Sequence, residues 1–191
     1  MAELIRISEE EFTEIYHKYM EKDFPQDELK PLDFMLEMMQ KKKSIAVELM
    51  DGQKMLAYAV FIIPEDAACM LLDYFAVIKE YRGTGVGHTF FEVLPAFMQE
   101  RYPMQQRMLL EVECVADGKQ DLEIRKRRVA FYLGCGCKMT RIETVLFGVH
   151  FSILCYPFAK DTHAEESDLR FIYEEMLGTE YEKHVKIWEI E

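Results

Sequence analysis

The chain has 191 residues, of which 50% are hydrophobic and 30% charged, and its formal net charge is −12 at pH 7. A chain of this size and composition is most simply one globular domain with a sizeable core, which excludes a disordered polypeptide. The acidic balance argues against nucleic-acid binding, and it fits either solubility alone or attraction of a cationic substrate.

The spacing of apolar residues predicts the order β-α-α-β-β-β-α-β-α-β-β, followed by a helical tail. Ser8 and Glu11 form a capping-box pattern at the first helix, and Asp51-Gly52 is typical of a hairpin turn. Pro95 should kink or shorten the helix that contains it. The expected strands are about 2–7, 44–49, 55–63, 69–77, 107–115, 139–147 and 150–157, and the expected helices are about 8–22, 32–42, 88–102, 125–136 and 165–190, the last with a break at Gly178.

A glycine-rich turn, Tyr-Arg-Gly-Thr-Gly-Val-Gly at residues 81–87, joins the apolar strand 69–77 to a predicted helix. Glycine lets a backbone reach positive φ and approach a ligand closely. The first N–H groups of a helix carry partial positive charge, so a phosphate or pyrophosphate fits such a turn. The spacing excludes the phosphate loop of nucleotide hydrolases, which needs Lys-Ser/Thr after its glycines, and the dinucleotide fingerprint, whose third glycine comes one residue later.

The pattern Arg-x-x-Gly-x-Gly, preceded by Phe-Ala-Val at 75–77, resembles the cofactor loop of the GNAT superfamily of acyl-CoA-dependent N-acyltransferases. The resemblance implies a mixed α/β (α+β) fold whose central sheet is flanked by helices and splays between its fourth and fifth strands. It also implies acetyl-CoA as the acyl donor, with its pyrophosphate on the loop and its pantetheine arm paired with the backbone of strand 69–77. The cofactor-binding residues implied are Phe75, Ala76, Val77, Arg82, Gly83, Thr84, Gly85, Val86, Gly87 and His88.

A second segment, residues 125–137, resembles the other characteristic helix of that family, roughly Asn-x-x-Ala-x-x-x-Tyr-x-x-x-Gly-Phe. Tyr132 and Gly136 fall in register, whereas Arg125, Arg128 and Cys137 replace the Asn, the Ala and the Phe. Because the Asn helps to hold the cofactor in the family, Arg125 is a candidate for a charge-assisted bond to a phosphate. The resemblance covers about residues 3–157, and the polar loop expected at 117–122 is longer than is usual in the family.

Acetyl transfer to an amine needs a base for the ammonium, an N–H donor for the oxyanion and an acid for the departing thiolate. The resemblance makes Tyr132 the candidate acid, and a backbone N–H near residues 75–77 the candidate oxyanion donor. Glu111, in a Leu-Glu-Val context like that of the family's ribosomal-protein acetyltransferases, is one candidate base. Asp73 is its competitor, because other members carry a proton-transferring His there. Alternatively, neither Glu111 nor Asp73 acts in catalysis, and both are ion-paired or face the solvent.

These features predict an enzyme, an acetyl-CoA-dependent N-acetyltransferase that acts on a small-molecule primary amine by direct transfer in a ternary complex. Two alternatives stay open: a non-catalytic acyl-CoA-binding sensor, and a protein N-terminal or lysine acetyltransferase. Residues 1–158 are expected to form the GNAT acetyltransferase domain. Residues 159–191 are expected to be a helical extension of that domain, which would narrow the acceptor groove or contribute to a homodimer.

The cysteines and the termini give expectations about location and metals. The five cysteines are odd in number and lack a C-x-x-C pair, so they predict reduced thiols in a cytoplasmic protein and no metal site. No apolar stretch is long enough to span a bilayer, and the acidic start does not fit a secretion signal. The sequence therefore predicts neither a membrane partner nor a nucleic-acid partner.

Overall fold

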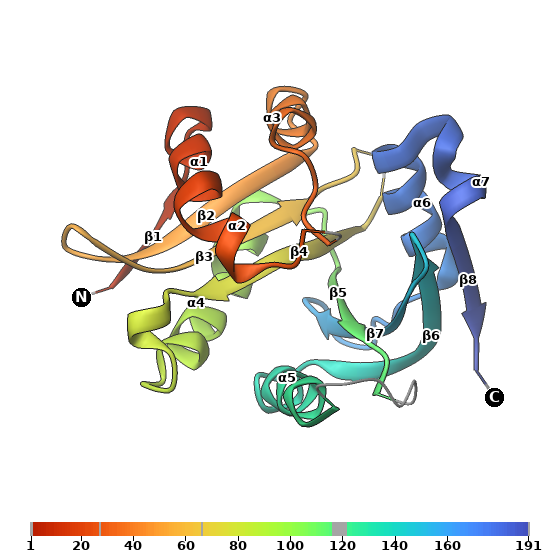
Figure 1. Cartoon of the computed structure of the whole chain (residues 1–191). Helices are drawn as coiled ribbons and strands as arrows, with labels where there is room; N and C mark the ends of the chain where they lie inside the picture. Colours follow the sequence, from red (N-terminus) through yellow and green to blue (C-terminus); the bar gives the residue numbers. More distant parts are fainter. Residues whose placement is uncertain (1, 27, 66, 116–121, 191) are drawn as a thin grey trace. The chain divides into compact units, whose positions relative to one another are not determined.

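Figure 1 shows a computed structural model of the chain, which describes residues 2–26, 28–65, 67–115 and 122–190. The eight strands lie in the order β1-β2-β3-β4-β5-β7-β6-β8. The chain divides into two compact units, unit 1 (residues 1–63 and 73–97) and unit 2 (residues 64–72 and 98–191). The strands are β1 (Glu3–Arg6), β2 (Ser44–Asp51), β3 (Lys54–Ile62), β4 (Cys69–Val77), β5 (Arg107–Glu113), β6 (Lys138–Leu146), β7 (Val149–Pro157) and β8 (Val185–Glu189). The α-helices are α1 (Glu9–Ile15), α2 (Glu21–Asp23), α3 (Leu32–Gln40), α4 (Val86–Arg101), α5 (Leu122–Gly134), α6 (Glu166–Leu177) and α7 (Tyr181–His184).

In unit 1 the strands β1, β2 and β3 are antiparallel neighbours, and α1 and α3 lie on the same side of them (Figure 1). A π-helical stretch, Tyr16–Met20, joins α1 to α2. The core beneath these helices contains Phe12, Met20, Met35 and Tyr58, all nearly inaccessible to solvent. The methionines of α3 are therefore core residues, which is the more common role of such an apolar face.

Local signals at the start of the chain form the predicted structures. The Ser8 hydroxyl accepts the Glu11 N–H (3.3 Å) while the Glu11 carboxylate accepts the Ser8 N–H (2.9 Å), so the capping box is confirmed. The Ser8 hydroxyl also donates to Glu11 Oε2 (2.7 Å), and this hydrogen bond, together with the one from the Ser8 N–H, lowers the pKa of Glu11. The turn between β2 and β3 places Gly52 at φ 60°, a value that the predicted Asp-Gly hairpin requires. The helix α4 continues through Pro95 to Arg101, so Pro95 does not end it.

Unit 2 contains the rest of the sheet. Strand β7 lies antiparallel between β5 and β6, and β6 in turn pairs with β8. The first half of β4 pairs in parallel with β5, over Cys69–Leu72 and Arg107–Leu110.

The end of the chain corrects one prediction. The helix α6 and the break at Gly178 (φ 53°) are confirmed, but residues 185–189 form a strand rather than a helix. Strand β8 pairs with β6, with Val185 opposite Leu146 and Ile187 opposite Thr144. The edge of β6 carries backbone N–H and C=O groups that a neighbouring strand can pair with and a helix cannot. Strand pairing therefore outweighs the helical tendency of this tail.

Two further findings concern the limits of the fold. The long polar loop expected at 117–122 lies outside the described residues, apart from Leu122 at the start of α5. Among the residues that the structure describes, no helix is both long and apolar enough to cross a bilayer.

A buried ion pair attaches α6 to the sheet of unit 2. The Arg107 guanidinium donates to both carboxylate oxygens of Asp168, at 2.7 and 2.5 Å, and the two side chains are 13% and 7% exposed. We expect Asp168→Asn to lower the free energy of unfolding by about 3 kcal/mol, because it leaves the Arg107 charge buried without its counter-ion. Urea unfolding measures this loss. The double variant Arg107→Met, Asp168→Leu should recover part of it, and a single variant as stable as the parent protein would contradict the assignment.

Candidate active site

The glycine-rich turn has the backbone geometry that its sequence predicts. Gly83 and Gly85 lie at φ 77° and 91°, in the left-handed region that favours glycine. The helix α4 begins directly after them at Val86, and the Thr89 N–H donates to the Gly85 carbonyl over 3.1 Å. Among the described residues no atom lies within 4 Å of where a Cβ would stand on either glycine. The glycines are therefore required by the backbone conformation and not by close packing.

Packing fixes the strand and the helix on either side of this turn. Phe75 of β4 stacks on Phe90 of α4, with ring centroids 5.1 Å apart and planes inclined by 20°. The neighbouring side chains of β4, Tyr74 and Ala76, are buried in the core on the opposite face. Residues 75–77 and the start of α4 are thus held against each other within unit 1.

The Arg82 side chain forms hydrogen bonds to the end of β4 and to α2. Its Nε donates to the carbonyl of Val77, the last residue of β4, over 2.9 Å. Its Nη2 donates to Asp23 Oδ1 over 2.5 Å, and the Tyr58 hydroxyl donates to the other oxygen of Asp23 over 2.9 Å. Sequence reasoning missed Asp23, because it lies 59 residues before Arg82 and no local pattern links the two.

The remaining residues of the predicted loop lie at its surface. The Thr84 hydroxyl donates to the carbonyl of Tyr81 over 2.7 Å, which closes the turn. Val86 and Gly87 are half-buried in the first turn of α4, and the His88 side chain is exposed.

Asp73, a candidate base, lies on β4 in unit 1 and is ion-paired. Lys30 Nζ donates to Asp73 Oδ1 over 2.7 Å, and the Asp73 side chain is only 4% exposed. Its second oxygen, Oδ2, is buried and has no hydrogen-bond partner in the described part of the chain. Lys30 lies in the segment between α2 and α3. The Tyr74 hydroxyl also holds the backbone of this segment, because it accepts the Lys30 N–H (3.0 Å) and donates to the Glu28 carbonyl (2.9 Å).

Glu111, the other candidate base, lies on β5 in unit 2 with a neutral partner. The Tyr173 hydroxyl of α6 donates to Glu111 Oε1, and the same hydroxyl lies 3.3 Å from Thr144 Oγ1. Thr144 is fully buried in β6. Glu111 is half-buried. Tyr173 was not predicted, because no pattern near residue 173 points to a partner on β5.

Tyr132, the candidate acid, is buried on α5, and this burial raises the pKa of its hydroxyl above the ordinary value of tyrosine. Two residues after α5 ends, Gly136 lies at φ 93°, so the predicted helix stop is confirmed. The Cys137 N–H donates to the Tyr132 carbonyl over 3.0 Å.

Arg125 already has protein partners at the start of α5. Its guanidinium donates to Glu113 Oε1 (2.5 Å) and to the carbonyl of Cys114 (3.1 Å), and Arg128 Nη1 lies 3.4 Å from Glu113 Oε2. These contacts attach α5 to the end of β5. The contact of Arg125 with a phosphate stays a prediction.

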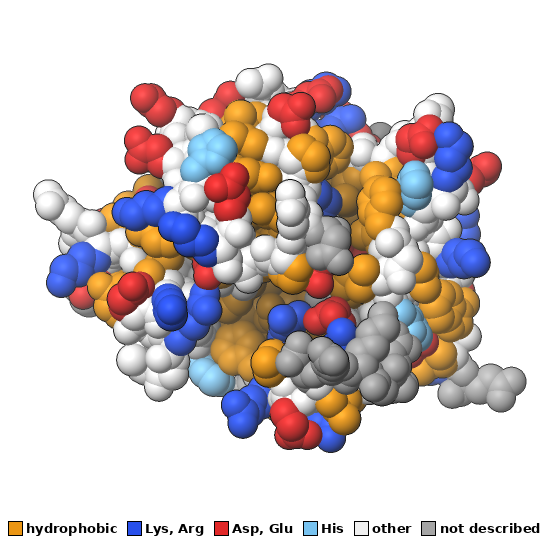
Figure 2. Space-filling view, viewed as in Figure 1, with side chains coloured by type: hydrophobic (Ala, Val, Ile, Leu, Met, Phe, Trp, Pro, Cys, Tyr) orange, Lys and Arg blue, Asp and Glu red, His pale blue; other side chains and the backbone are white. Residues whose placement is uncertain are grey.

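The charges on the surface pair locally. Figure 2 shows acidic and basic side chains near one another on the face that it draws. In unit 1, exposed pairs such as Glu37 with Lys41 and His17 with Glu21 lie one helical turn apart. Such pairs contribute little to stability, but they place charges of opposite sign next to each other on the surface.

A match to a known protein family identifies the class of this protein. The sequence profile of the Acetyltransferase (GNAT) family matches residues 1–121, more than half of the chain. The chain therefore belongs to the GNAT acetyltransferase family, and the protein is by class an N-acetyltransferase. No curated protein matches the chain.

Solved structures share this fold at low identity. A GNAT-family protein from Bacteroides thetaiotaomicron is similar with a TM-score of 0.68 and 16% identity, over 94% of this chain and 98% of that one. The ribosomal-protein-S18-alanine N-acetyltransferase of Escherichia coli has a TM-score of 0.58 and 16% identity, over 86% and 100% of the two chains. A Bacillus subtilis acetyltransferase in complex with CoA has a TM-score of 0.54 and 12% identity, over 83% and 98%.

The positive φ angles of the turn lead to a test. We expect Gly85→Ala to weaken CoA binding about tenfold, or about 1.4 kcal/mol, because an L-residue resists φ 91° and shifts the turn. Calorimetric titration with CoA measures this change. Gly134→Ala in α5, where φ is not positive, is the matched control and should keep the affinity of the parent protein. Equal affinities of both variants would contradict the role of the turn.

Proposed function

We propose that the protein transfers the acetyl group of acetyl-CoA to the primary amine of a small molecule. The observation that carries the proposal is the turn at residues 82–88. Two glycines at positive φ directly precede the start of α4, which packs against the strand segment 75–77, and no described atom lies within 4 Å of where their Cβ atoms would stand. This geometry suits a pyrophosphate, so the residues present fit the cofactor that the family uses.

In this proposal the N–H groups of the turn and of the first residues of α4 hold the pyrophosphate, and the backbone of residues 75–77 pairs with the pantetheine arm. Bound acetyl-CoA would supply the activated thioester. A backbone N–H near residues 75–77 would donate to the oxyanion that forms when the amine attacks. Arg82 would act by keeping the turn against Val77, the contact that its Nε makes.

Tyr132 is proposed to donate a proton to the departing thiolate. Its raised pKa supports this role, because the hydroxyl stays protonated at neutral pH.

The pKa values of two buried cysteine thiols support direct transfer of the acetyl group to the amine. Burial raises the pKa of Cys137 to about 12 and that of Cys155 to about 11, so these groups stay protonated and are poor nucleophiles.

We propose Glu111 as the base that takes the ammonium proton. Its partner Tyr173 has a second acceptor, Thr144 Oγ1, within 3.3 Å. When Glu111 is protonated, the Tyr173 hydroxyl can turn to Thr144 and accept the new proton of the carboxyl group as a hydrogen bond. Both protonation states of Glu111 are thus satisfied, whereas a proton on Asp73 would break its ion pair with Lys30.

Asp73 is instead proposed to bind the acceptor. Its Oδ2 is buried and has no hydrogen-bond partner among the described residues, although a buried carboxylate oxygen normally has one. An ammonium or N–H group of the acceptor would satisfy it. This role fits a cationic small molecule, and the net charge of −12 supports the same class of acceptor.

A screen that follows release of free thiol from acetyl-CoA tests the proposed function. Polyamines, aminoglycosides and basic peptides are offered separately, with Tyr132→Phe as the comparison. We expect turnover with a small amine, and a loss of kcat of roughly 100-fold in Tyr132→Phe with unchanged CoA affinity. Turnover with peptides alone would indicate a protein acetyltransferase, and CoA binding without any turnover would indicate a sensor.

The pH dependence of the same reaction has a predicted sign. A general acid is active in its protonated form, which persists below its pKa. Because burial raises the pKa of Tyr132, kcat should not fall as the pH rises to about 10, the ordinary pKa of tyrosine. A decline of kcat between pH 8 and 9 that disappears in Tyr132→Phe would contradict this prediction.

The two carboxylates should differ in kinetics. We expect Glu111→Gln to lower kcat by roughly 100-fold with little change in the KM of the acceptor, because it removes the base. Asp73→Asn should raise the acceptor KM by about tenfold, because it weakens acceptor binding. Steady-state kinetics at saturating acetyl-CoA measure both. Glu37→Gln, at an exposed carboxylate of α3, is the charge-matched control. If instead Glu111→Gln raised the acceptor KM and Asp73→Asn lowered kcat, Asp73 would be the base and Glu111 would bind the acceptor.

A further inference from the structure

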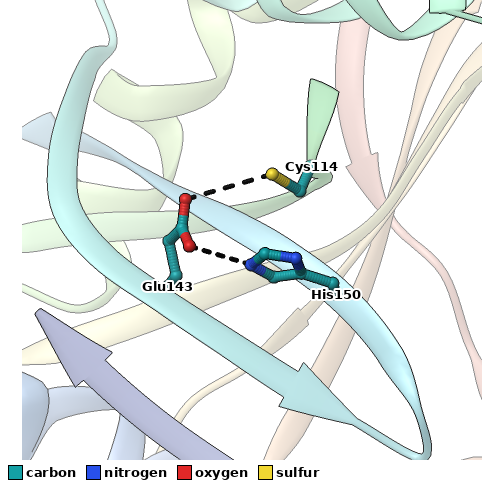
Figure 3. Close-up of side chains that lie close together, drawn as sticks. All are labelled: Cys114, Glu143 and His150. Atoms are coloured by element: carbon teal, nitrogen blue, oxygen red, sulfur yellow. Dashed lines mark hydrogen bonds and ion pairs between the residues drawn. The ribbon is translucent and has the colours of Figure 1, made fainter. Parts of the chain in front are cut away.

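Three side chains of metal-binding type meet in unit 2 (Figure 3). Cys114 directly follows β5, Glu143 lies in β6 and His150 lies in β7. Cys114 Sγ lies 3.9 Å from Glu143 Oε1, and His150 Nε2 lies 2.9 Å from Glu143 Oε2. One ligand atom from each residue lies within 4.8 Å of the other two. None of the three has a role in the proposed acetyl transfer.

The sheet itself builds this cluster. The Cys114 N–H donates to the His150 carbonyl over 2.9 Å, which extends the pairing of β5 with β7 to these residues. In β6 the register shifts between Met139 and Glu143, and such bulges re-aim the side chains that follow them. Thr140 Oγ1 holds the irregular segment, since it accepts the Ile142 N–H (3.0 Å) and donates to the Ile153 carbonyl (2.8 Å).

We propose that Cys114, Glu143 and His150 bind one divalent transition-metal ion, and that the ion is Zn²⁺. Thiolate sulfur, imidazole nitrogen and carboxylate oxygen are the ligands of protein zinc sites, with bonds of about 2.0–2.3 Å. A tetrahedral ion with such bonds separates its ligand atoms by about 3.2–3.6 Å. To bind one ion, the ligand atoms, which now lie within 4.8 Å of one another, would move to this spacing.

Charge balance favours an ion at this place. Without metal, the Cys114 thiol donates to one oxygen of Glu143, and His150, in the tautomer with a proton on Nε2, donates to the other. A divalent ion displaces the thiol proton, and the imidazole keeps its one proton on Nδ1 so that Nε2 can bind the ion; the thiolate and the carboxylate together then neutralise the charge of the ion. The cluster therefore changes from the single negative charge of the Glu143 carboxylate to a neutral site.

Among the described residues the cluster supplies three ligands, so a tetrahedral ion would keep a fourth position. Glu143 and His150 are partly accessible, with side chains 16% and 22% exposed, while Cys114 is buried. Three protein ligands with an open position are usual where zinc binds water or a further ligand. Within the described part of the chain, the cluster thus differs from a closed structural zinc site, which has four protein ligands.

The only tryptophan of the chain reports on this cluster. The rings of Trp188 and His150 lie 5.2 Å apart, and Trp188 is paired with Glu143 in the register of β8 with β6. An ion bound at His150 should therefore change the fluorescence of Trp188. No other residue of the chain contributes tryptophan emission, so the signal belongs to this site.

The test uses the full chain, treated with a chelator and kept reduced, and titrated with Co²⁺ as a spectroscopic probe for Zn²⁺. We expect a thiolate-to-cobalt charge-transfer band that saturates at one ion per chain and rises together with quenching of Trp188 fluorescence. Added Zn²⁺ should remove the band. Zn²⁺ should also raise the melting temperature, because it binds only the folded state.

Variants separate a metal site from a hydrogen-bonded cluster. Cys114→Ser should abolish the band, and Glu143→Gln and His150→Gln should each weaken Zn²⁺ affinity by on the order of 100-fold, since even outer contacts of a site contribute about 10–100-fold. Cys135→Ser and His163→Gln, which alter a thiol and an imidazole outside the cluster, are the controls and should bind as the parent protein does. Circular dichroism confirms that each variant folds.

Three outcomes would overturn the proposal: no saturable band, a band that persists in Cys114→Ser, or equal losses in the control variants. If Cys114→Ser does not fold, Glu143→Gln decides, because Gln keeps the size of the side chain and removes the charged ligand. Acetyl transfer is not used as a readout, so failure of this site leaves the proposed function untouched, and the reverse also holds.

Discussion

The stacking of Phe75 on Phe90 is the contact on which the proposed cofactor site depends. It holds the end of β4 against the start of α4, with ring centroids 5.1 Å apart. The chain that connects them, residues 78–85, has left-handed backbone at Gly83 and Gly85, a conformation that favours glycine. The anion binding proposed for the turn thus rests on hydrophobic packing, because packing holds the helix N-terminus near the end of the strand.

A polar layer completes this arrangement in unit 1. Asp23, at the end of α2, holds the Arg82 guanidinium, and Tyr58 of β3 holds Asp23. The proposed cofactor turn is therefore linked to the N-terminal helices by charge-assisted hydrogen bonds, which are stronger than neutral ones. Burial raises the pKa of Tyr58, so its hydroxyl stays a donor to Asp23 at any physiological pH.

The strands of unit 2 carry different chemistry on their two faces. Neighbouring residues of a strand point to opposite faces of the sheet, so the side chains of Glu143 and Thr144 lie on opposite faces. On the face with Thr144, the Tyr173 hydroxyl joins α6 to Glu111, the proposed base. On the other face, Glu143 joins Cys114 and His150 in the proposed metal site. One sheet register thereby sets the geometry of both groups.

Local signals in the sequence were sufficient for most elements, including the bounds of β4 at Cys69–Val77 and the glycine turn, because capping, turn chemistry and apolar periodicity act over a few residues. Strand β8 was missed, since its conformation depends on the edge of β6. The sequence by itself thus determined the family, the strand–turn–helix unit and the candidate residues. Only the tertiary structure decided the partners of those residues, such as Lys30 for Asp73 and Glu113 for Arg125, because these contacts join segments that no local pattern relates.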